Sequence, residues 1–526
     1  MIDMAMKKVK RIEKETSLFC LDDCIATLAG YYQCDYEMMY IGGYQVSRQQ
    51  GIQDFAEWYD IWLRGRFDNL QKYHGIMIQK YDFYWKHRVI RKIREELDGG
   101  RPVLLLLNPF WCPWDDGFQK YDAVPGHCFL IKGEYDGGFL CVDPYFEKDG
   151  QELPFAMFRK GLQEVYLTGK QEIRGTSAGE ERRTLERMYQ SLSETAYFDL
   201  LRSFIIDMDQ NGNIFQGVRM DADFWISPLI VFLLKINQSM QNIATVTAYV
   251  AGRCQSLSLQ ARGEKLWNIA VKWKQARKLV IKLYFIKRQD EKLKARTVER
   301  LMSIIDEMEE AVSEVPEEPV GETLAEELAC CGDTGSGKPG SGQVVLDLKE
   351  YMNNKAFLRQ SALEKGEREA DFSSIGHCYV LDDTEGFHVL HTRERKIPLP
   401  EAGQPGNDNI ACNGQVVALP QGRYSQVILI GSAEFGNSSD IMKIVSAAGR
   451  EYEVEFCFTD YICEPFFGES IAWKGRGIYK KDQGYEWMPE DLYLYEQRLT
   501  MPEDTICEMI LPINPSVHLF AIVLIL

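Results

Sequence analysis

The chain has 526 residues, of which 45% are hydrophobic and 12% aromatic, and its formal net charge is −18. This apolar content is enough to bury several hydrophobic cores, and the length predicts about three domains. The acidic balance argues against a surface that binds nucleic acid, because phosphate backbones require clustered lysine and arginine.

The sequence shows no targeting or membrane-spanning segment. The charged start, with Lys7, Lys8 and Lys10, is not followed by the apolar region of a secretory signal. The longest apolar runs, at 225–234 and 520–526, are shorter than the roughly 20 residues that cross a bilayer, so we expect a core helix and a buried strand. We therefore expect a cytoplasmic protein, without membrane partners, whose 14 cysteines are reduced.

The first part of the chain is predicted to be mixed α and β structure. Apolar periodicity indicates two helices, a buried strand and a hairpin, in that order, at residues 20–32, 87–97, 102–107 and 127–142. Gly137 and Gly138 tolerate the positive φ that the tight turn of the hairpin needs. The hairpin then places His127 and Asp143 near the same open end.

The predicted secondary structure changes twice along the rest of the chain. From about residue 180 the pattern is helical, with long periodic segments at 257–288 and 296–314, and from about 343 short β-rich runs alternate with turns. Between them lies a stretch rich in Pro, Glu, Gly and Ser that is too polar to pack. We predict an α+β multidomain fold divided into an α/β domain, a helical domain, a flexible linker and a β-sandwich, at 1–175, 176–315, 316–342 and 343–526.

Cys20, the first residue of a predicted helix, is a candidate nucleophile. A helix N-terminus and a neighbouring imidazole both lower the pKa of a thiol and so generate the reactive thiolate. His127 would take the thiol proton and Asp143 would orient the imidazole. The alternative is a buried structural cysteine, and periodicity alone leaves Cys24, one turn later, equally plausible.

We expect no metal and no cofactor. The chain has no Cys-x-x-Cys pair. The stretch 332–338 imitates a phosphate-binding loop, but Pro339 stands where a Ser or Thr must bind magnesium. The stretch 207–212 imitates the start of a calcium loop, but Val218 occupies the position of the bidentate Glu.

The segment around Cys20 resembles the bacteriocin-processing leader peptidases, which have a papain-like fold. Their nucleophile lies in a pattern close to Asp-Cys-Gly-x-x-Cys-Leu-Ala, with Tyr-Tyr-Gly a few residues later. Alignment through residues 31–32, both Tyr, places Cys20 at the nucleophile and Cys24 at the second cysteine. His127 matches their Gly-His-Phe-x-Val strand, and Asp143 matches their Asp-Pro. The resemblance implies a papain-like domain with Cys20, His127 and Asp143 as catalytic residues.

Two departures from that pattern bear on the reaction. The leader peptidases carry a Gln six residues before the Cys for the oxyanion hole, where this chain has Lys14, and Phe19 replaces their Asp. Asn108 is a candidate replacement donor, with a capping or turn Asn as the alternative, and the aromatic segment 108–116 either overhangs the site or forms a packed loop. The long helical stretch is similar to the butirosin biosynthesis protein H group, acyltransferases that move an acyl group from a carrier protein to an amine.

The C-terminal part has its own resemblance, over residues 370–526. The stretches 416–425, 429–437 and 511–522 resemble the galactose-binding-like β-sandwich appended to some glycoside hydrolases. The resemblance implies this fold but not a function, because such sandwiches often serve as interaction or structural modules, with a glycan or a protein as the partner to consider here.

These patterns together favour an acyltransferase of specialised metabolism that uses an acyl-Cys20 intermediate. Its partners would be an acyl carrier protein and a small amine. A cysteine peptidase or amidase acting on a peptide is the first alternative. A non-catalytic protein that binds a carbohydrate or a partner is the second.

Overall fold

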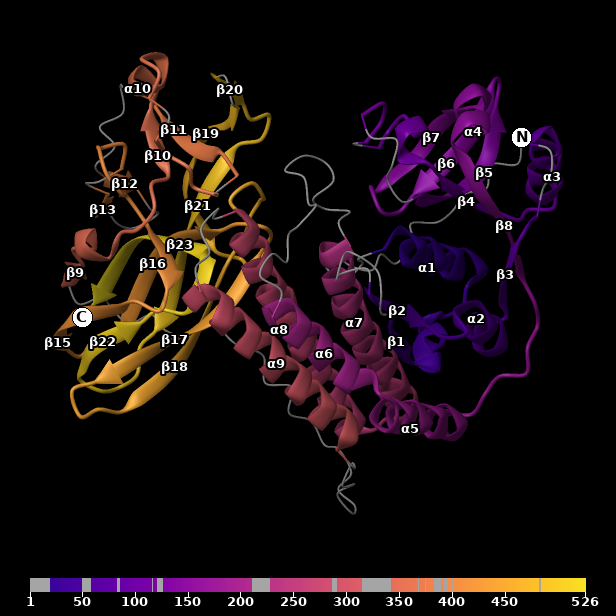
Figure 1. Cartoon of the computed structure of the whole chain (residues 1–526), viewed down its shortest axis with the longest axis horizontal. Helices are drawn as coiled ribbons and strands as arrows, with labels where there is room; N and C mark the ends of the chain where they lie inside the picture. Colours follow the sequence, from indigo (N-terminus) through magenta and orange to yellow (C-terminus); the bar gives the residue numbers. More distant parts are fainter. Residues whose placement is uncertain are drawn as a thin grey trace. The chain divides into compact units, whose positions relative to one another are not determined.

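The computed structural model describes most of the chain. The described residues are 19–49, 58–82, 86–115, 117–120, 126–210, 228–285, 291–314, 342–367, 369–373, 375–382, 389–391, 396–399, 402–481 and 484–526. They fall into two compact units, one of Met1–Lys274 with Val298–Glu322 and the other of Gln275–Thr297 with Thr323–Leu526. The first unit combines a mixed α/β part with a helical region, and the second contains a β-sandwich (Figure 1).

A six-stranded antiparallel sheet forms the centre of the mixed α/β part. Its order is β3 (Ile76–Lys80), β8 (Leu162–Lys170), β4 (Val103–Leu107), β5 (His127–Tyr135), β6 (Gly138–Asp143) and β7 (Lys148–Pro154). β4, one valine and four leucines, pairs with β5 and β8 on its two sides. Helices α3 (Lys86–Asp98) and α4 (Phe155–Gly161) pack on this sheet through buried Val89, Leu105 and Phe158. An apolar central strand is thus covered by neighbours and helices.

Helix α1 (Cys20–Tyr32) packs against β5, as Figure 1 places it beside the sheet. Asp22 and Asp23 lie in its first turn, where carboxylates complement the positive end of the helix dipole. The buried Asp22 is compensated by Arg66, 2.9 Å away, and accepts a hydrogen bond from Gln238 Nε2 at 2.7 Å. Four short elements follow: η1 (Glu37–Gly42), β1 (Tyr44–Arg48), β2 (Tyr59–Leu63) and α2 (Arg66–His74).

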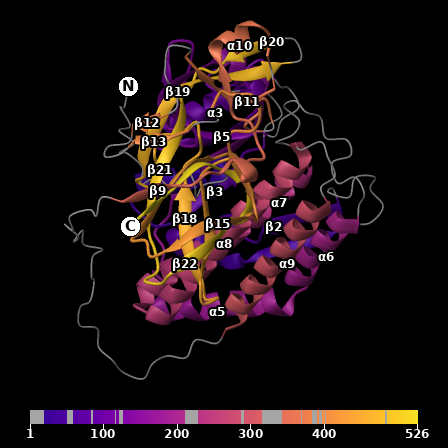
Figure 2. The same ribbon diagram turned by 90° about the vertical axis from the view of Figure 1, so that its left-hand side faces the viewer.

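Long helices make up the rest of the first unit. They are α5 (Ala178–Glu194), α6 (Tyr197–Gln210), α7 (Pro228–Cys254), most of α8 (Leu257–Phe285) and most of α9 (Glu291–Ser313). A capping box begins α5, in which the Ser177 side chain and the Glu180 carboxylate each accept the other's backbone N–H. α6 and α9 lie side by side in both views, joined by an ion pair of Arg202 with Asp306 at 2.7 Å (Figure 1 and Figure 2). None of the described helices is both long and apolar enough to cross a membrane.

Two sheets form the sandwich of the second unit. The larger contains β10 (Phe357–Arg359), β11 (His377–Leu381), β19 (Ser470–Lys481), β21 (Leu492–Thr500), β16 (Gln426–Ala433), β23 (Ile513–Ile525) and β14 (Ile410–Asn413), with β9 (Gln343–Val345) beside β23 and β20 (Gly484–Trp487) beside β19. The smaller contains β15 (Val416–Gly422), β22 (Ile506–Ile510), β17 (Ser438–Ser446) and β18 (Glu451–Phe458). β12 (Val389–His391) pairs with β13 (Lys396–Pro398) separately. One core joins the sheets, with Val427 and Leu524 from the larger and Met442 and Met509 from the smaller.

The structure confirms most of the predicted elements. The helices predicted at 20–32 and 87–97 are α1 and α3, and the strand predicted at 102–107 is β4. The predicted buried strand at 520–526 is the end of β23, which stops at Ile525 and leaves Leu526 exposed. The predicted linker lies outside the described residues except for its last residue. The predicted domain boundaries stay predictions. In the structure, α8 passes from the first unit to the second between Lys274 and Gln275.

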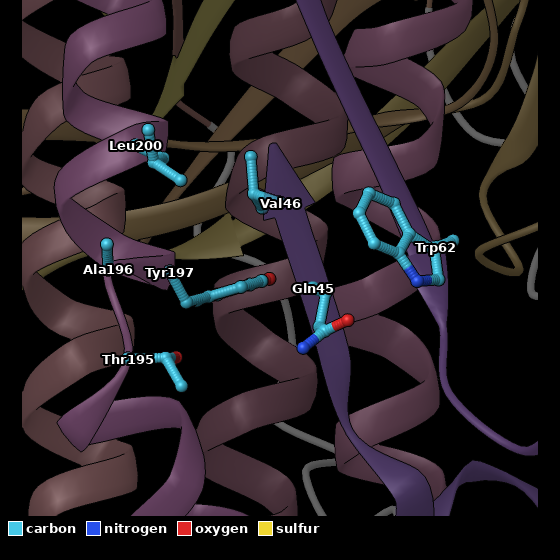
Figure 3. A pocket seen from close by; sticks show the side chains of 7 residues that line it. All are labelled: Gln45, Val46, Trp62, Thr195, Ala196, Tyr197 and Leu200. Atoms are coloured by element: carbon cyan, nitrogen blue, oxygen red, sulfur yellow. The ribbon is translucent and has the colours of Figure 1, made fainter. Parts of the chain in front are cut away.

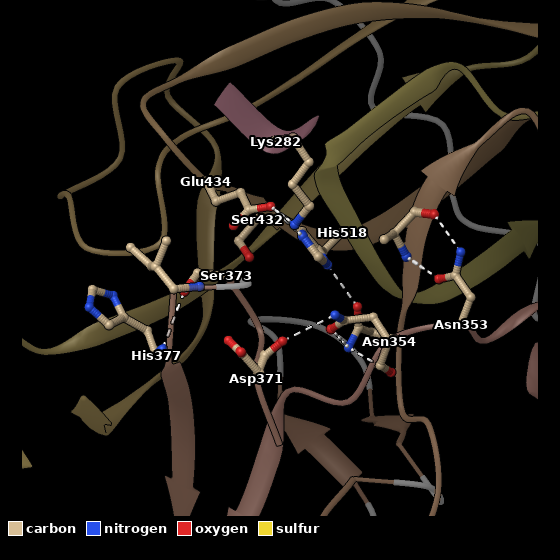
Figure 4. Close-up of polar contacts among 12 residues, drawn as sticks. Lys282, Asn353, Asn354, Asp371, Ser373, His377, Ser432, Glu434 and His518 are labelled. Atoms are coloured by element: carbon tan, nitrogen blue, oxygen red, sulfur yellow. Dashed lines mark hydrogen bonds and ion pairs between the residues drawn. The ribbon is translucent and has the colours of Figure 1, made fainter. Parts of the chain in front are cut away.

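Two lysines near the end of α8, Lys278 and Lys282, are buried against the sandwich within the second unit. Figure 4 shows Lys282 beside Glu434 and His518. Lys278 donates to the carbonyl oxygens of Gly436 at 2.7 Å and Asn437 at 2.6 Å. Lys282 forms an ion pair with Glu434, whose side chain is fully buried and lies 3.3 Å from His518 Nε2. The last turns of α8 therefore supply the positive charge that a buried carboxylate of the sandwich needs.

Replacing Lys282 with Met should destabilise the second unit. Glu434 would lose the partner that forms its ion pair, and breaking a buried ion pair by removing one partner costs about 3–5 kcal/mol. The Lys282→Met/Glu434→Leu double variant should recover most of that loss, because both charges are then gone. The midpoint of urea unfolding measures this loss of stability.

In contrast, Lys443→Met, which breaks an exposed ion pair with Glu451, should leave the unfolding midpoint unchanged. An unchanged midpoint for Lys282→Met would contradict this account.

Candidate active site

The structure brings Cys20, His127 and Asp143 together, although they lie far apart in the sequence. Cys20 is the first residue of α1, His127 is the first of β5, and Asp143 is the last of β6. β5 and β6 form an antiparallel hairpin, so its start and end lie at the same open edge. Because α1 packs against β5, the helix N-terminus reaches this edge. The catalytic role of the three residues stays a prediction.

The imidazole of His127 is held by Asp143. His127 Nε2 lies 2.6 Å from Asp143 Oδ2, and both side chains are buried. The same carboxylate oxygen accepts from Trp114 Nε1 at 2.8 Å, and Oδ1 accepts from the Phe146 N–H at 3.2 Å. Since Nε2 is turned to Asp143, the other ring nitrogen, Nδ1, is the one left for the side of Cys20. The carboxylate thus fixes both the orientation and the tautomer of the ring.

Cys20 has several donors around its sulfur. The backbone N–H of Cys128 donates to Cys20 Sγ at 3.2 Å. The Cys128 and His127 side chains lie close enough to this sulfur to shift its pKa. The Cys128 thiol, and then the hydrogen bond and charge of His127, outweigh burial and hold the pKa of Cys20 well below its ordinary value. The helix N-terminus acts in the same direction.

The pKa of His127 is shifted in the opposite direction to that of Cys20. Burial disfavours its charged form, but hydrogen bonds to Asp143 and Cys20, and the negative charge of both, raise its pKa to about 10. These shifts favour a Cys20 thiolate and a His127 imidazolium near neutral pH, because each charge stabilises the other. Such an ion pair is the resting state that thiol nucleophiles need.

Cys24, the competing cysteine, lies in a different environment. Its side chain is fully buried one turn further along α1. Burial raises its pKa well above the ordinary value, and the negative charge of Cys20 adds to this effect. A buried, protonated thiol is a poor nucleophile, so the chemistry favours Cys20.

Aromatic rings close one side of the site. His127 packs against Phe129, Tyr145 and Phe146, with ring centroids 5.2–5.9 Å apart. Trp114, from the predicted aromatic segment, is buried against Phe129 at 5.1 Å and bonds Asp143. These rings keep water from the His127–Asp143 bond and so strengthen it.

The residues considered for the oxyanion hole have other surroundings. The Asn108 side-chain oxygen accepts from the Phe110 N–H at 3.0 Å and caps the short helix η3 (Pro109–Trp111). Asn108 therefore has the capping role that the sequence analysis gave as the alternative to an oxyanion-hole donor. Lys14 lies outside the described residues. The Cys20 N–H is placed to act as a donor, because the first N–H groups of an α-helix have no intrahelical acceptor.

Sequence reasoning missed the part that Cys128 plays. Successive side chains of a strand point to opposite faces, so a contact of His127 with Cys20 did not predict one for Cys128. The signal that could have indicated this contact is the position of Cys128 in the chain. His127 and Cys128 are the first two residues of β5, and the backbone of β5 packs against α1. Trp114 was noticed only as an aromatic residue, and its bond to Asp143 had no sequence signal.

The stretches that imitate ion or nucleotide sites lie wholly or largely outside the described residues. Among the described residues, no group of three or more His, Cys, Asp or Glu side chains is arranged to hold a metal ion. The phosphate-loop imitation at 332–338 lies outside the described residues. So does the second half of the calcium-loop imitation, from residue 211.

The described residues of the first unit line at least two hollows, a smaller and a larger one. The smaller, about 190 Å³, is lined by Gln45, Val46, Trp62, Thr195, Ala196, Tyr197 and Leu200 (Figure 3). Its described lining carries no charged side chain, and its volume is below that of ordinary ligand pockets. The larger, about 840 Å³, is a groove along α7 and α8 with Tyr249 and Trp267 among its walls and Glu37 and Glu264 at its edge.

Comparison with known proteins bears on the second unit. The family model of the AziU2-like β-sandwich domain matches residues 394–525, which lie within that unit. A search of curated proteins found no match to the chain. The match agrees with the sandwich seen in the structure, so a C-terminal β-sandwich is established both by the family model and by the strand order.

Cys20 should react with iodoacetamide faster than ordinary thiols at neutral pH. An ordinary thiol of pKa about 8.5 is only a few per cent ionised at about pH 7, so a full thiolate gains about tenfold even after its lower nucleophilicity. Since the pKa of Cys20 is lowered, its rate should stay level around neutral pH and fall only in acid. Peptide mass spectrometry at several pH values measures this rate.

Two variants make the labelling result specific. His127→Ala should slow alkylation of Cys20 about tenfold at about pH 7 and make it rise with pH like that of an ordinary thiol. Cys24→Ser should leave the rate unchanged, because Cys24 is buried and protonated. Equal rates for the wild type and His127→Ala would contradict the thiolate–imidazolium pair.

Proposed function

We propose that the N-terminal part is a papain-like cysteine domain that transfers an acyl group from a carrier-protein thioester to an amine. The observation that carries the proposal is the chain of contacts from Cys20 through His127 to Asp143 at the N-terminus of a helix packed on a sheet. An antiparallel sheet with such a helix is consistent with a papain-like fold. The resemblance to the butirosin biosynthesis protein H group supplies the reaction class.

The first half-reaction loads Cys20. The thiolate attacks the thioester carbonyl carbon, and a tetrahedral oxyanion forms beside the Cys20 N–H. When the intermediate collapses, the bond from carbon to the carrier's sulfur breaks. The imidazolium of His127 gives its proton to that leaving sulfur, so an acyl-Cys20 thioester and a neutral imidazole remain.

The second half-reaction releases the product. The neutral His127 takes a proton from the incoming amine as the amine attacks the acyl carbon. Collapse expels the Cys20 thiolate and restores the ion pair with His127. Asp143 stabilises the imidazolium at both ends of the cycle and keeps the ring from turning, because Trp114 and Phe146 hold the carboxylate in place.

A peptidase or amidase is the second candidate, because the same three groups also serve hydrolysis. In that reaction water replaces the amine as the final acceptor. Lys14, in place of the Gln that leader peptidases carry, favours transfer over peptide cleavage. For the sandwich we propose a galactose-binding-like module that holds a glycan or a partner protein.

Intact mass spectrometry tests the proposal directly. Incubation with acylated carrier proteins should add the mass of one acyl group to the protein, and addition of a small amine should remove it. The Cys20→Ala variant should show no adduct, and Cys24→Ala should load like the wild type. The absence of any adduct, together with cleavage of a leader peptide, would replace transfer by proteolysis. If neither reaction occurs, the site is not the catalyst proposed here.

A further inference from the structure

A second thiol lies against the candidate nucleophile. Cys128 follows His127 directly on β5, and its backbone N–H lies 3.2 Å from Cys20 Sγ. That short distance makes the two thiols close neighbours, and each shifts the pKa of the other. Both are free thiols. The cycle of acyl transfer uses only one of them, which leaves the second without a chemical task.

The two thiols differ in the way that disulfide formation requires. The hydrogen bond that Cys128 donates to Cys20, together with burial, raises the pKa of Cys128, whereas the pKa of Cys20 is lowered. A thiolate is the form that a peroxide oxidises, and oxidation of Cys20 removes the negative charge that helps to raise the pKa of Cys128, so that Cys128 can then ionise and resolve the product. The contact therefore pairs an oxidisable sulfur with a resolving one.

We propose that Cys20 and Cys128 form an oxidative modification site, at which a hydroperoxide converts the two thiols into a disulfide. The Cys20 thiolate attacks the terminal oxygen of the hydroperoxide, the O–O bond breaks, and the leaving alkoxide takes the proton of His127. Cys20 is then a sulfenic acid. The Cys128 sulfur attacks the Cys20 sulfur, the S–O bond breaks, and the hydroxide leaves as water with the Cys128 proton.

The electrons and atoms balance in this sequence. The two thiols lose two electrons and two protons, and the hydroperoxide is reduced to one alcohol and one water. A reductant such as a dithiol reverses the change by thiol–disulfide exchange. The partner is Cys128 rather than Cys24, because the Cys128 backbone N–H contacts the Cys20 sulfur, whereas Cys24 is fully buried one turn further along α1.

The disulfide has a consequence for the site, and this consequence rests on the proposed function. A disulfide removes the Cys20 thiolate, so the protein cannot be loaded with an acyl group until it is reduced. It also protects Cys20, because a sulfenic acid without a resolving thiol proceeds to irreversible sulfinic and sulfonic acids. Disulfide formation between Cys20 and Cys128 therefore inactivates the site reversibly and prevents the irreversible oxidation of Cys20.

Hydrogen peroxide treatment followed by mass spectrometry tests the proposal without any acyl donor. The wild type should lose about 2 Da, and a digest without reductant should contain a peptide pair joined through Cys20 and Cys128. Dithiothreitol should restore the original mass. In Cys128→Ser and Cys128→Ala, Cys20 should instead gain about 32 or 48 Da, which dithiothreitol does not remove. Cys24→Ser, the matched control from the same helix, should behave like the wild type.

Three results would overturn the proposal. They are sulfinic acid on wild-type Cys20 to the same extent as in Cys128→Ser, a crosslink from Cys20 to Cys24, and no oxidation of either thiol. The readout separates this proposal from acyl transfer. If the protein forms the disulfide but accepts no acyl group, the redox proposal stands and the acyltransferase proposal fails. If the protein is acylated but forms no crosslink, the acyltransferase proposal stands and the redox proposal fails.

Discussion

The hydrogen bond between His127 and Asp143 is the contact on which the proposed chemistry depends. Burial alone would leave the imidazole neutral, and a neutral ring gives Cys20 no counter-charge. The buried carboxylate reverses this preference and turns the ring so that its other nitrogen serves Cys20. The hairpin of β5 and β6 sets the contact, since the two residues stand at its open end. A sheet and a packed helix are thus enough to generate a thiolate.

The same physics governs the sandwich of the second unit. Glu434 is buried as completely as Asp143, and it too is tolerated because a positive partner reaches it, here Lys282 from α8. In both places the buried carboxylate is stabilised by the opposite charge of a side chain on a neighbouring element. For Glu434 that element is a helix outside the residues that match the sandwich family, so the family match covers less than the folded unit.

The sequence predicted elements better than it predicted contacts. Helix α1 and the β5–β6 hairpin follow from apolar periodicity and the turn glycines, and the proximity of His127 and Asp143 follows from the hairpin. The contact of Cys128 with Cys20 did not follow, because strand alternation says nothing about a strand's end. The burial of Lys278 and Lys282 was missed for a related reason. Helical periodicity describes one helix, and the carboxylate that draws a lysine inward lies on a strand about 150 residues later.

A direct titration of the Cys20 thiol tests the central claim, that this sulfur is ionised at rest. A thiolate absorbs ultraviolet light that a thiol does not, so the difference between the wild type and Cys20→Ser isolates one group as pH changes. We predict that the difference is present at neutral pH and disappears only in acid, and that His127→Ala moves it to the range of ordinary thiols. A wild-type difference that appears only as pH rises through about 8.5 would contradict the account.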